Sequence, residues 1–228
     1  MIGRVFAWLT DPANWQGSDG IAAQLGYHLL YTAIALAVAL VIGFPLGVYI
    51  GHTGKGQTVL MGLANAARAL PTLGLLILLV LLLAPVIKSN LAFTAPGLFV
   101  LVLLAIPPII SGTASGIGAI DRGTIDAARG MGCSEWRIIL AVEIPCGVPL
   151  IFSGIRSGLL QIVSTATVAA YVSLNGLGRF ILDGRATNNY PQIAGGAVLI
   201  TVLAIGLELT FAGLQRLATS PGLLHQAA

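Results

Sequence analysis

Charged residues are scarce in this sequence, since only 8% of its 228 residues are Asp, Glu, Lys or Arg and 57% are hydrophobic. A soluble domain carries about a quarter of its residues as charges. A surface that faces water cannot be built from so few charged side chains, so most of the exterior must face lipid. The length would suit one or two soluble domains, but the composition predicts a single helical membrane domain.

Other absences exclude classes of function. The net charge is +3, yet the sequence has no run of Lys and Arg and no basic–aromatic stripe, so nucleic acid is not an expected partner. It has no GxxxxGK[ST] loop for phosphate either, so no ATPase site of its own is expected. No Ser/His/Asp, metal or paired-carboxylate constellation stands out, which argues against a membrane enzyme with a bound metal or cofactor.

The few cysteines and histidines add no chemistry to this picture. Cys133 and Cys146 lack the spacing of metal ligands and are interpreted as small apolar residues. His28, His52 and His225 fall at the ends of predicted spans or in tails, form no ligand cluster, and are assigned no role.

Long apolar segments are abundant, and a membrane span needs about 20 such residues. The sequence therefore predicts an all-α transmembrane fold with about five membrane-spanning helices in a domain over residues 27–217. Pro107 and Pro108 lie inside the third helix and are expected to kink or break it, because each removes a backbone donor. The predicted spans cover approximately residues 27–50, 71–86, 95–118, 145–172 and 193–214.

The two ends of the chain are expected on opposite sides of the membrane, because the number of spans is odd. Within residues 1–26, apolar side chains recur at helical spacing, which is typical of a short amphipathic helix in the membrane interface, and a frayed tail is the alternative. The excess of Lys and Arg in alternate loops is small and places segment 1–26 outside the cell and the tail, residues 218–228, in the cytoplasm.

A polar segment, residues 120–143, separates the third and fourth spans. Thr124 is expected to cap a short helix, and Gly132 to end it in the left-handed conformation. Ser134 is expected to cap a second helix, which Pro145 ends or kinks. Two short helices joined by a glycine form a rigid projection that is suited to transmitting force from a soluble partner. The local pattern alone also fits an ordinary polar loop.

The resemblance to a known family decides between these readings. Asp126-Ala127-Ala128-Arg129-Gly130-Met131-Gly132, followed after nine residues by Val142-Glu143-Ile144-Pro145, resembles the EAA loop of type I ABC importer permeases, which have the MetI-like fold. The resemblance implies that residues 120–143 form a cytoplasmic coupling loop that docks on a separate ATPase, which holds ATP and Mg²⁺. The implied coupling residues are Asp126, Ala127, Ala128, Arg129, Gly130, Gly132 and Pro145, with Ala127, Ala128 and Gly132 as the contact core.

Four further segments are similar to the glycine betaine/carnitine/choline branch, and more narrowly to ProZ-type osmoprotectant permeases. The resemblance implies a bacterial cell membrane, a second permease (a paralogue or a copy of this chain), an extracellular substrate-binding protein and a small quaternary-ammonium solute. The alternatives are another small solute such as an amino acid, or an ion-coupled secondary transporter. The segments are Arg68-Ala69-Leu70-Pro71-Thr72-Leu73, Ser153-Gly154-Ile155-Arg156-Ser157-Gly158, Thr165-Ala166-Thr167-Val168-Ala169-Ala170-Tyr171 and Gly176-Leu177-Gly178-Arg179.

Some residues within the spans are candidates for the transport pathway. Arg156 is costly inside a membrane, and a structural pair with Glu208 is favoured over contact with solute. Tyr171 offers an aromatic face to a quaternary ammonium group, but aromatic residues at that depth are more often interfacial anchors. Pro107 and Pro108 provide a candidate gating bend.

Overall fold

The computed structural model describes residues 1–69, 71–87, 89, 91–172 and 174–219, and the side chains of all of these except residues 61, 63–65, 67 and 68. Nearly all regular structure in these residues is helical, and four helices are long and apolar enough to cross a membrane. The predicted all-α transmembrane fold is thus confirmed. These helices are α2 (Ile21–Thr53), α5 (Leu91–Gly118), the continuous helix that contains α8 (Ile144–Ala169), and α10 (Tyr190–Ala218). His225 and most of the predicted tail, residues 218–228, lie outside the described residues.

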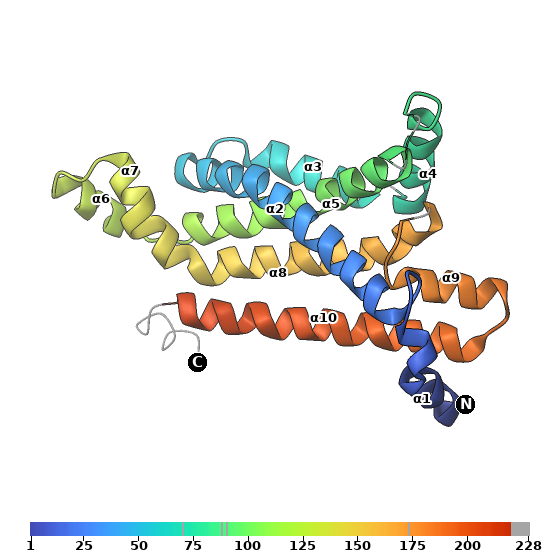
Figure 1. Cartoon of the computed structure of the whole chain (residues 1–228). Coiled ribbons are helices and arrows are strands. Elements are labelled where there is room, and N and C mark those ends of the chain that lie inside the picture. The colour runs from blue at the N-terminus through green and yellow to red at the C-terminus, as the bar shows by residue number, and fades with distance from the viewer. Residues whose placement is uncertain (70, 88, 90, 173, 220–228) are drawn as a thin grey trace.

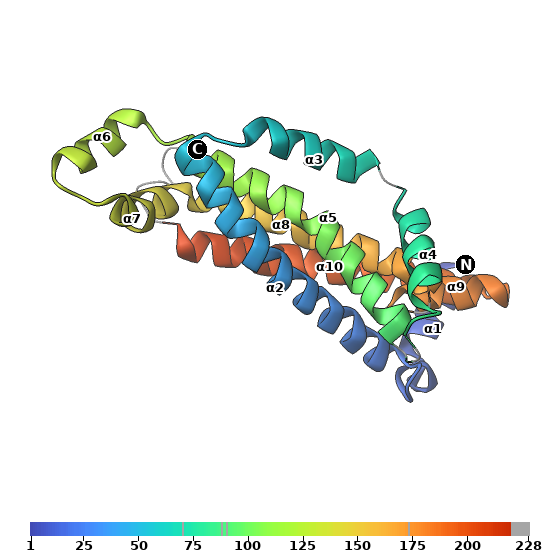
Figure 2. The ribbon, with the colours of Figure 1, turned by 90° about the horizontal axis from the view of Figure 1, so that it is seen from above.

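Two helices connect the end of α2 to the start of α5. They are α3 (Gln57–Ala69) and α4 (Thr72–Leu83) (Figures 1 and 2). The sequence predicts a span over residues 71–86 here, preceded by an apolar segment, residues 58–70, that is either an interfacial helix or an extension of the same span. With 12 residues α4 is only about 18 Å long, which is too short for about 30 Å of hydrocarbon. Pro71 precedes α4 with a ψ of 104°, an extended conformation that cannot continue a helix.

Small residues bring α5 and α8 into close contact. A Cβ on Gly154 would lie 2.7 Å from the carbonyl oxygen of Pro108 and 2.8 Å from the Cα of Gly112. One turn away, a Cβ on Gly116 would lie 2.8 Å from the carbonyl oxygen of Gly147. This close approach depends on glycines in both helices.

Helix α5 runs without a break through Pro107 and Pro108. Of the two expected outcomes, a kink or a break, the break is therefore wrong, and the kink stays a prediction. Proline is tolerated inside membrane helices where neighbouring segments support the backbone, and here α8 packs on the carbonyl of Pro108 through Gly154.

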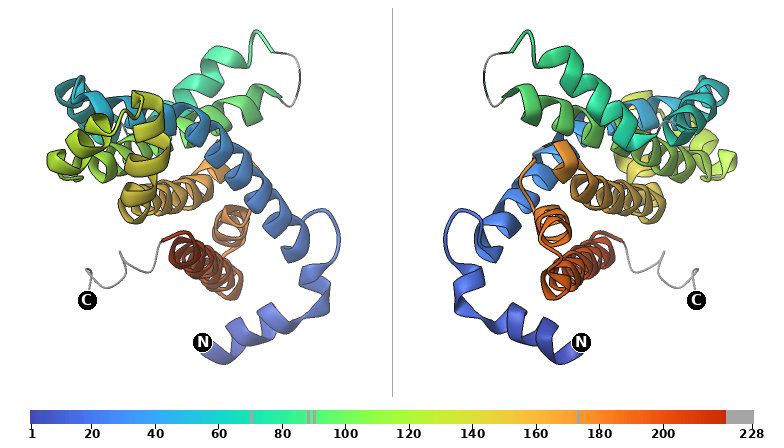
Figure 3. Two further views of the ribbon diagram at one scale, coloured as in Figure 1. Left: turned by 90° about the vertical axis from the view of Figure 1, so that its left-hand side faces the viewer. Right: turned by 90° about the vertical axis from the view of Figure 1, so that its right-hand side faces the viewer.

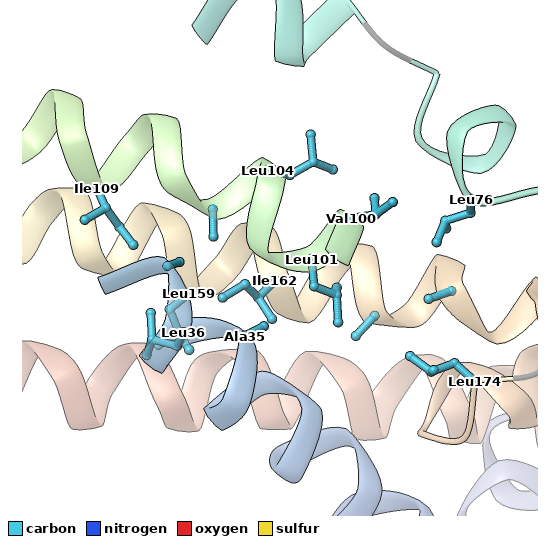
Figure 4. Close-up of a cluster of buried hydrophobic side chains, with 14 of the residues drawn as sticks. Ala35, Leu36, Leu76, Val100, Leu101, Leu104, Ile109, Leu159, Ile162 and Leu174 are labelled. Carbon is cyan, nitrogen blue, oxygen red and sulfur yellow. The ribbon is translucent and has the colours of Figure 1, made fainter. Parts of the chain in front are cut away.

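The hydrophobic core lies where α2, α5 and α8 meet, and α4 and the segment after α8 close one end of it (Figure 4). Leu101 of α5, Ile162 of α8 and Ala35 of α2 are fully or almost fully buried in this core. Leu76 is the buried residue that α4 contributes. The core thus fixes α5 and α8 as the central helices.

The N-terminal helix α1 (Ile2–Thr10) packs beside α10, as the end-on views of Figure 3 show. Trp8 lies against Gly195 of α10, and its ring meets that of Phe180 edge-on with centroids 5.4 Å apart. Ile2 and Phe6 are exposed. The amphipathic helix is therefore confirmed as a helix, and its place in a membrane interface stays a prediction. The short elements are η1 (Pro12–Trp15), α6 (Arg122–Gly130), α7 (Glu135–Ile138), η2 (Ile139–Glu143), η3 (Ala170–Val172) and α9 (Gly178–Ala186).

Candidate coupling site

Helix α6 forms the first half of the predicted coupling loop, and both of its ends are capped by local sequence. The Asp121 side chain accepts a hydrogen bond from the backbone N–H of Thr124 at 3.2 Å, so the expected cap by Thr124 is wrong. Asp121 occupies the position whose carboxylate reaches the free N–H groups of the first turn. At the other end Gly132 has a φ of +84°, as expected for a residue that ends the helix in the left-handed conformation.

The second half of the loop is a four-residue helix, α7, that continues through a π-helical turn into α8. Ser134 stands at the N-cap position, although its side chain makes no capping hydrogen bond. In the π turn the N–H of Ile144 bonds to the carbonyl of Ile139. Pro145 therefore lies in the first turn of α8 and does not end the preceding helix, whereas the alternative, a kink at this proline, stays a prediction. The wider turn avoids the clash between a proline ring and the carbonyl four residues earlier.

The loop protrudes at one end of the helical bundle (Figure 1). Its exposed residues include the predicted coupling residues Asp126, Ala127, Arg129, Gly130, Gly132 and Pro145. Ala128 differs, because only 4% of its surface is exposed. An approaching partner would therefore meet Ala127 and Gly132 of the predicted contact core, whereas Ala128 packs inside the loop.

Two large apolar side chains stand out on the loop surface. Met131 and Trp136 are 79% and 75% exposed. Sequence reasoning did not single them out, although large apolar residues in an otherwise polar loop are a recognisable signal. A contiguous exposed apolar patch is typical of a surface that binds a partner, and these two side chains are candidates for such a patch.

Ion pairs hold α6 against α7. The Arg129 guanidinium donates to the Glu135 carboxylate at 2.8 and 3.0 Å and to Asp126 at 3.3 Å. The hydrogen bond to Glu135 raises the pKa of Arg129 above its usual value, so the guanidinium stays charged. The two-pronged contact fixes the angle between α6 and α7 more firmly than a single bond does.

His52 and Glu143 connect this loop to the membrane helices. The His52 Nδ1 lies 2.9 Å from both Glu143 carboxylate oxygens, and its Nε2 lies 3.4 Å from Glu135 Oε2. His52 is therefore held between two carboxylates at the end of α2. His52 and Glu143 are 91 positions apart, so no local pattern signals their contact. His28 is not at a span end but buried inside α2.

A cavity of about 810 Å³ separates the loop from the ends of α2 and α5. His52 and Gly54 line it on one side, Ser111 and Ser115 on another, and Asp126 and Arg129 on the loop side. This cavity therefore lies between α6 and the ends of α2 and α5, whereas the end of the loop at η2 packs against α2.

The geometry is that of a short, capped and exposed helix joined to membrane helices. Comparison with known proteins gives the family of the chain. The family of binding-protein-dependent transport system inner membrane components matches residues 43–219. The chain belongs to this family. Membership confirms the prediction of an ABC importer permease, a multi-pass membrane protein and a transport subunit.

Similar proteins support the same assignment. The chain is 31% identical to the glycine betaine/carnitine/choline transport system permease protein OpuCB of Bacillus subtilis (strain 168), over 88% of this chain and 89% of that protein. It is 30% identical to the osmoprotectant import permease protein OsmW of Salmonella typhimurium, over 90% and 94%. An inward-facing structure of the MetNI methionine ABC transporter superposes with a TM-score of 0.75 at 20% identity, over 88% and 96%. This likeness confirms the MetI-like fold.

In this permease, Arg156 of α8 pairs with Glu208 of α10, as the sequence predicts. Arg156 also donates to the Gln215 side-chain oxygen at 3.0 Å, and the Gln215 amide donates to the Pro149 carbonyl at 3.3 Å. The Arg156 and Glu208 side chains are 29% and 30% exposed, so both are largely enclosed between α8 and α10. The guanidinium is occupied by protein groups, which favours the structural role.

No hydrogen bond or ion pair in the described part of the chain joins the other pathway candidates to Arg156. Tyr171 is exposed in η3, at the end of the permease opposite the coupling loop. Pro107 and Pro108 lie within α5 near its packing seam with α8. Their roles in transport stay predictions.

Proposed function

We propose that this permease imports small quaternary-ammonium osmoprotectants, such as glycine betaine, choline, carnitine or proline betaine, in an ATP-driven complex of a bacterial cell membrane. The solute class is supported by the names of the similar permeases, OpuCB and OsmW. The observation that carries the coupling role is the capped and ion-paired loop with exposed Ala127, Met131 and Trp136. This surface is the docking site for the ATPase.

Coupling follows from how this chain is connected. The ATPase supplies ATP hydrolysis with its own ATP and Mg²⁺, and its closure moves the docked α6. Because Arg129 fixes α6 to α7, and α7 continues into α8, this movement is passed to a central helix of the membrane domain. Helix α8 then moves against α5 or carries α5 with it, which changes access to the pathway.

Further partners complete the complex. No residue in the most apolar part of α10 is buried within this chain, so we assign its free surface to lipid and to a second permease, a paralogue or a second copy. The coupling loop lies in the cytoplasm, and the α1 and α9 end faces the extracellular substrate-binding protein. The proposed orientation agrees with Lys55, Arg122 and Arg137 at the loop end.

Replacing Ala127 by tryptophan is expected to release the ATPase from a permease that remains folded. The larger side chain prevents close approach to the α6 backbone, and we expect at least a tenfold loss of bound ATPase, or about 1.4 kcal/mol. Co-purification of the tagged permease with its ATPase measures the effect. Ala186→Trp, at an exposed alanine of α9, is the matched control and should retain the ATPase.

Retention of the ATPase by Ala127→Trp and by Met131→Asp together would contradict docking on this loop. Uptake of labelled glycine betaine into vesicles tests the solute and the energy source at the same time. Uptake without ATP, driven by an ion gradient, would favour a secondary transporter. ATP-driven uptake of an amino acid but not of glycine betaine would change the solute class alone.

Replacing Tyr171 by leucine is expected to raise the KM for glycine betaine about fivefold, because an exposed cation–π contact contributes about 1 kcal/mol. Tyr171→Phe keeps the aromatic face and should behave as wild type. Unchanged uptake by the leucine variant at equal expression would assign Tyr171 to anchoring in the interface.

A further inference from the structure

His52 lies where three elements meet. It belongs to the last turn of α2, which ends at Thr53 and is followed by Gly54 with a φ of +69°. This glycine, whose N–H bonds to the Ile50 carbonyl at 2.9 Å, ends the helix immediately after the histidine. The ring is therefore held on a rigid helix end and not on a loop.

One side of the His52 ring is occupied by Glu143 of the π turn. Glu143 is only 1% exposed, and a buried carboxylate is costly unless it is paired. The Nδ1 of His52 lies 2.9 Å from both carboxylate oxygens. This contact ties the end of α2 to the point where the loop enters α8.

The other side of the ring faces the coupling loop. The His52 Nε2 lies 3.4 Å from Glu135, and Glu135 in turn binds Arg129, which also binds Asp126. A continuous chain of polar contacts thus runs from α6 to the end of α2. Because two carboxylates face its two nitrogens, the imidazole bridges α7 and the π turn.

We propose that His52 is a positioning residue that holds the coupling loop at a fixed position relative to α2. Movement of the docked ATPase then reaches α2 as well as α8. The proposal rests on the proposed function of the loop. The cavity between the loop and the ends of α2 and α5 supports it, because direct packing does not fill that space. Without the bridge, the loop pivots at the π turn and part of the imposed movement is lost.

The test uses the complete complex in liposomes, with labelled glycine betaine as the probe and the solute transported per ATP hydrolysed as the readout. In His52→Leu/Glu143→Leu both partners are apolar, so no unpaired buried carboxylate remains to disturb folding. We expect the ATPase to stay bound, and the transport-to-hydrolysis ratio to fall about tenfold, within the range for coupling between sites. Gln57→Leu changes the same cavity wall and should keep the wild-type ratio.

A second variant keeps the proposal falsifiable if the double variant does not assemble. Glu135→Gln changes an exposed residue, weakens the bridge and should lower the same ratio. A wild-type ratio in the double variant would show that His52 only neutralises Glu143, and this would overturn the proposal. A wild-type ratio in Glu135→Gln would overturn it as well. If the wild-type complex itself shows no ATP-driven uptake, the proposed function fails before any His52 variant is measured.

Discussion

Valine in place of Gly154 is expected to prevent the permease from folding into a single species. The added Cβ would lie 2.7 Å from the Pro108 carbonyl and 2.8 Å from the Gly112 Cα, and both are backbone atoms of a packed helix. Neither can move as a flexible side chain can, so α5 and α8 must separate. We expect destabilisation of about 3 kcal/mol or more, at the upper end for overpacking. Size-exclusion chromatography of the solubilised protein would show loss of the monodisperse peak.

Gly206→Val in α10 is the matched control, because no atom lies within 4 Å of a Cβ at that position. Gly158→Ala should be intermediate, since its Cβ would meet the Ile109 side chain at 3.1 Å and a carbonyl at 3.2 Å. A monodisperse and thermally stable Gly154→Val protein would show that α5 and α8 are not packed as described.

Arg156→Met is expected to destabilise the permease strongly, because it leaves Glu208 without its cationic partner between α8 and α10. Breaking a fully buried pair from one side costs about 3 kcal/mol, and this value is the upper limit here because the two side chains are 29% and 30% exposed. The unfolding temperature of the purified protein should fall accordingly. Arg216→Met, at an exposed arginine near the end of α10, should leave it unchanged.

The double variant Arg156→Met/Glu208→Leu distinguishes two causes of instability. One is the carboxylate of Glu208 left without a partner, and the other is the loss of the arginine side chain itself. Removing both charges leaves no uncompensated carboxylate, so most of the stability should return. If the double variant is as unstable as Arg156→Met alone, the packing of the arginine side chain, and not its pairing, is the cause. Restored stability with lost uptake would instead assign the charge to transport.

The membrane helices were predictable because lipid requires long apolar segments whose backbone groups are satisfied internally. The limits of α5 and α8 follow the hydropathy of the sequence to within a few residues. The division between α3 and α4 was not resolved, because hydropathy does not distinguish a straight span from two shorter apolar helices. Pro71 marks the point of division, but proline at that position also suits the first turn of a single helix.

The coupling loop was predictable where its chemistry is local. Gly132 ends α6 as expected because the left-handed conformation favours glycine. The orientation of Ala128 and the contact between His52 and Glu143 depend on how distant segments pack. Neither leaves a trace in the spacing of neighbouring residues. The pairing of Arg156 with Glu208 could be predicted from the sequence, because two opposite charges inside membrane helices favour each other as partners.

The π turn before α8 contributes to the direction in which the coupling loop points from the axis of α8. Each residue in an α-helix turns the chain by about 100°, and a π turn holds one more residue than an α turn does. Removing a single residue from Ile139–Glu143 would therefore let this turn close as an ordinary α turn, and α7 would keep nearly the same direction. Removing a residue from the first turns of α8, where no wide turn absorbs the change, would instead rotate α7 by about 100° about the axis of α8, and Trp136 would point in a different direction. The direction of the partner surface thus depends on the helical phase of α8, so the choice of ATPase can change through a one-residue deletion that leaves every docking side chain intact.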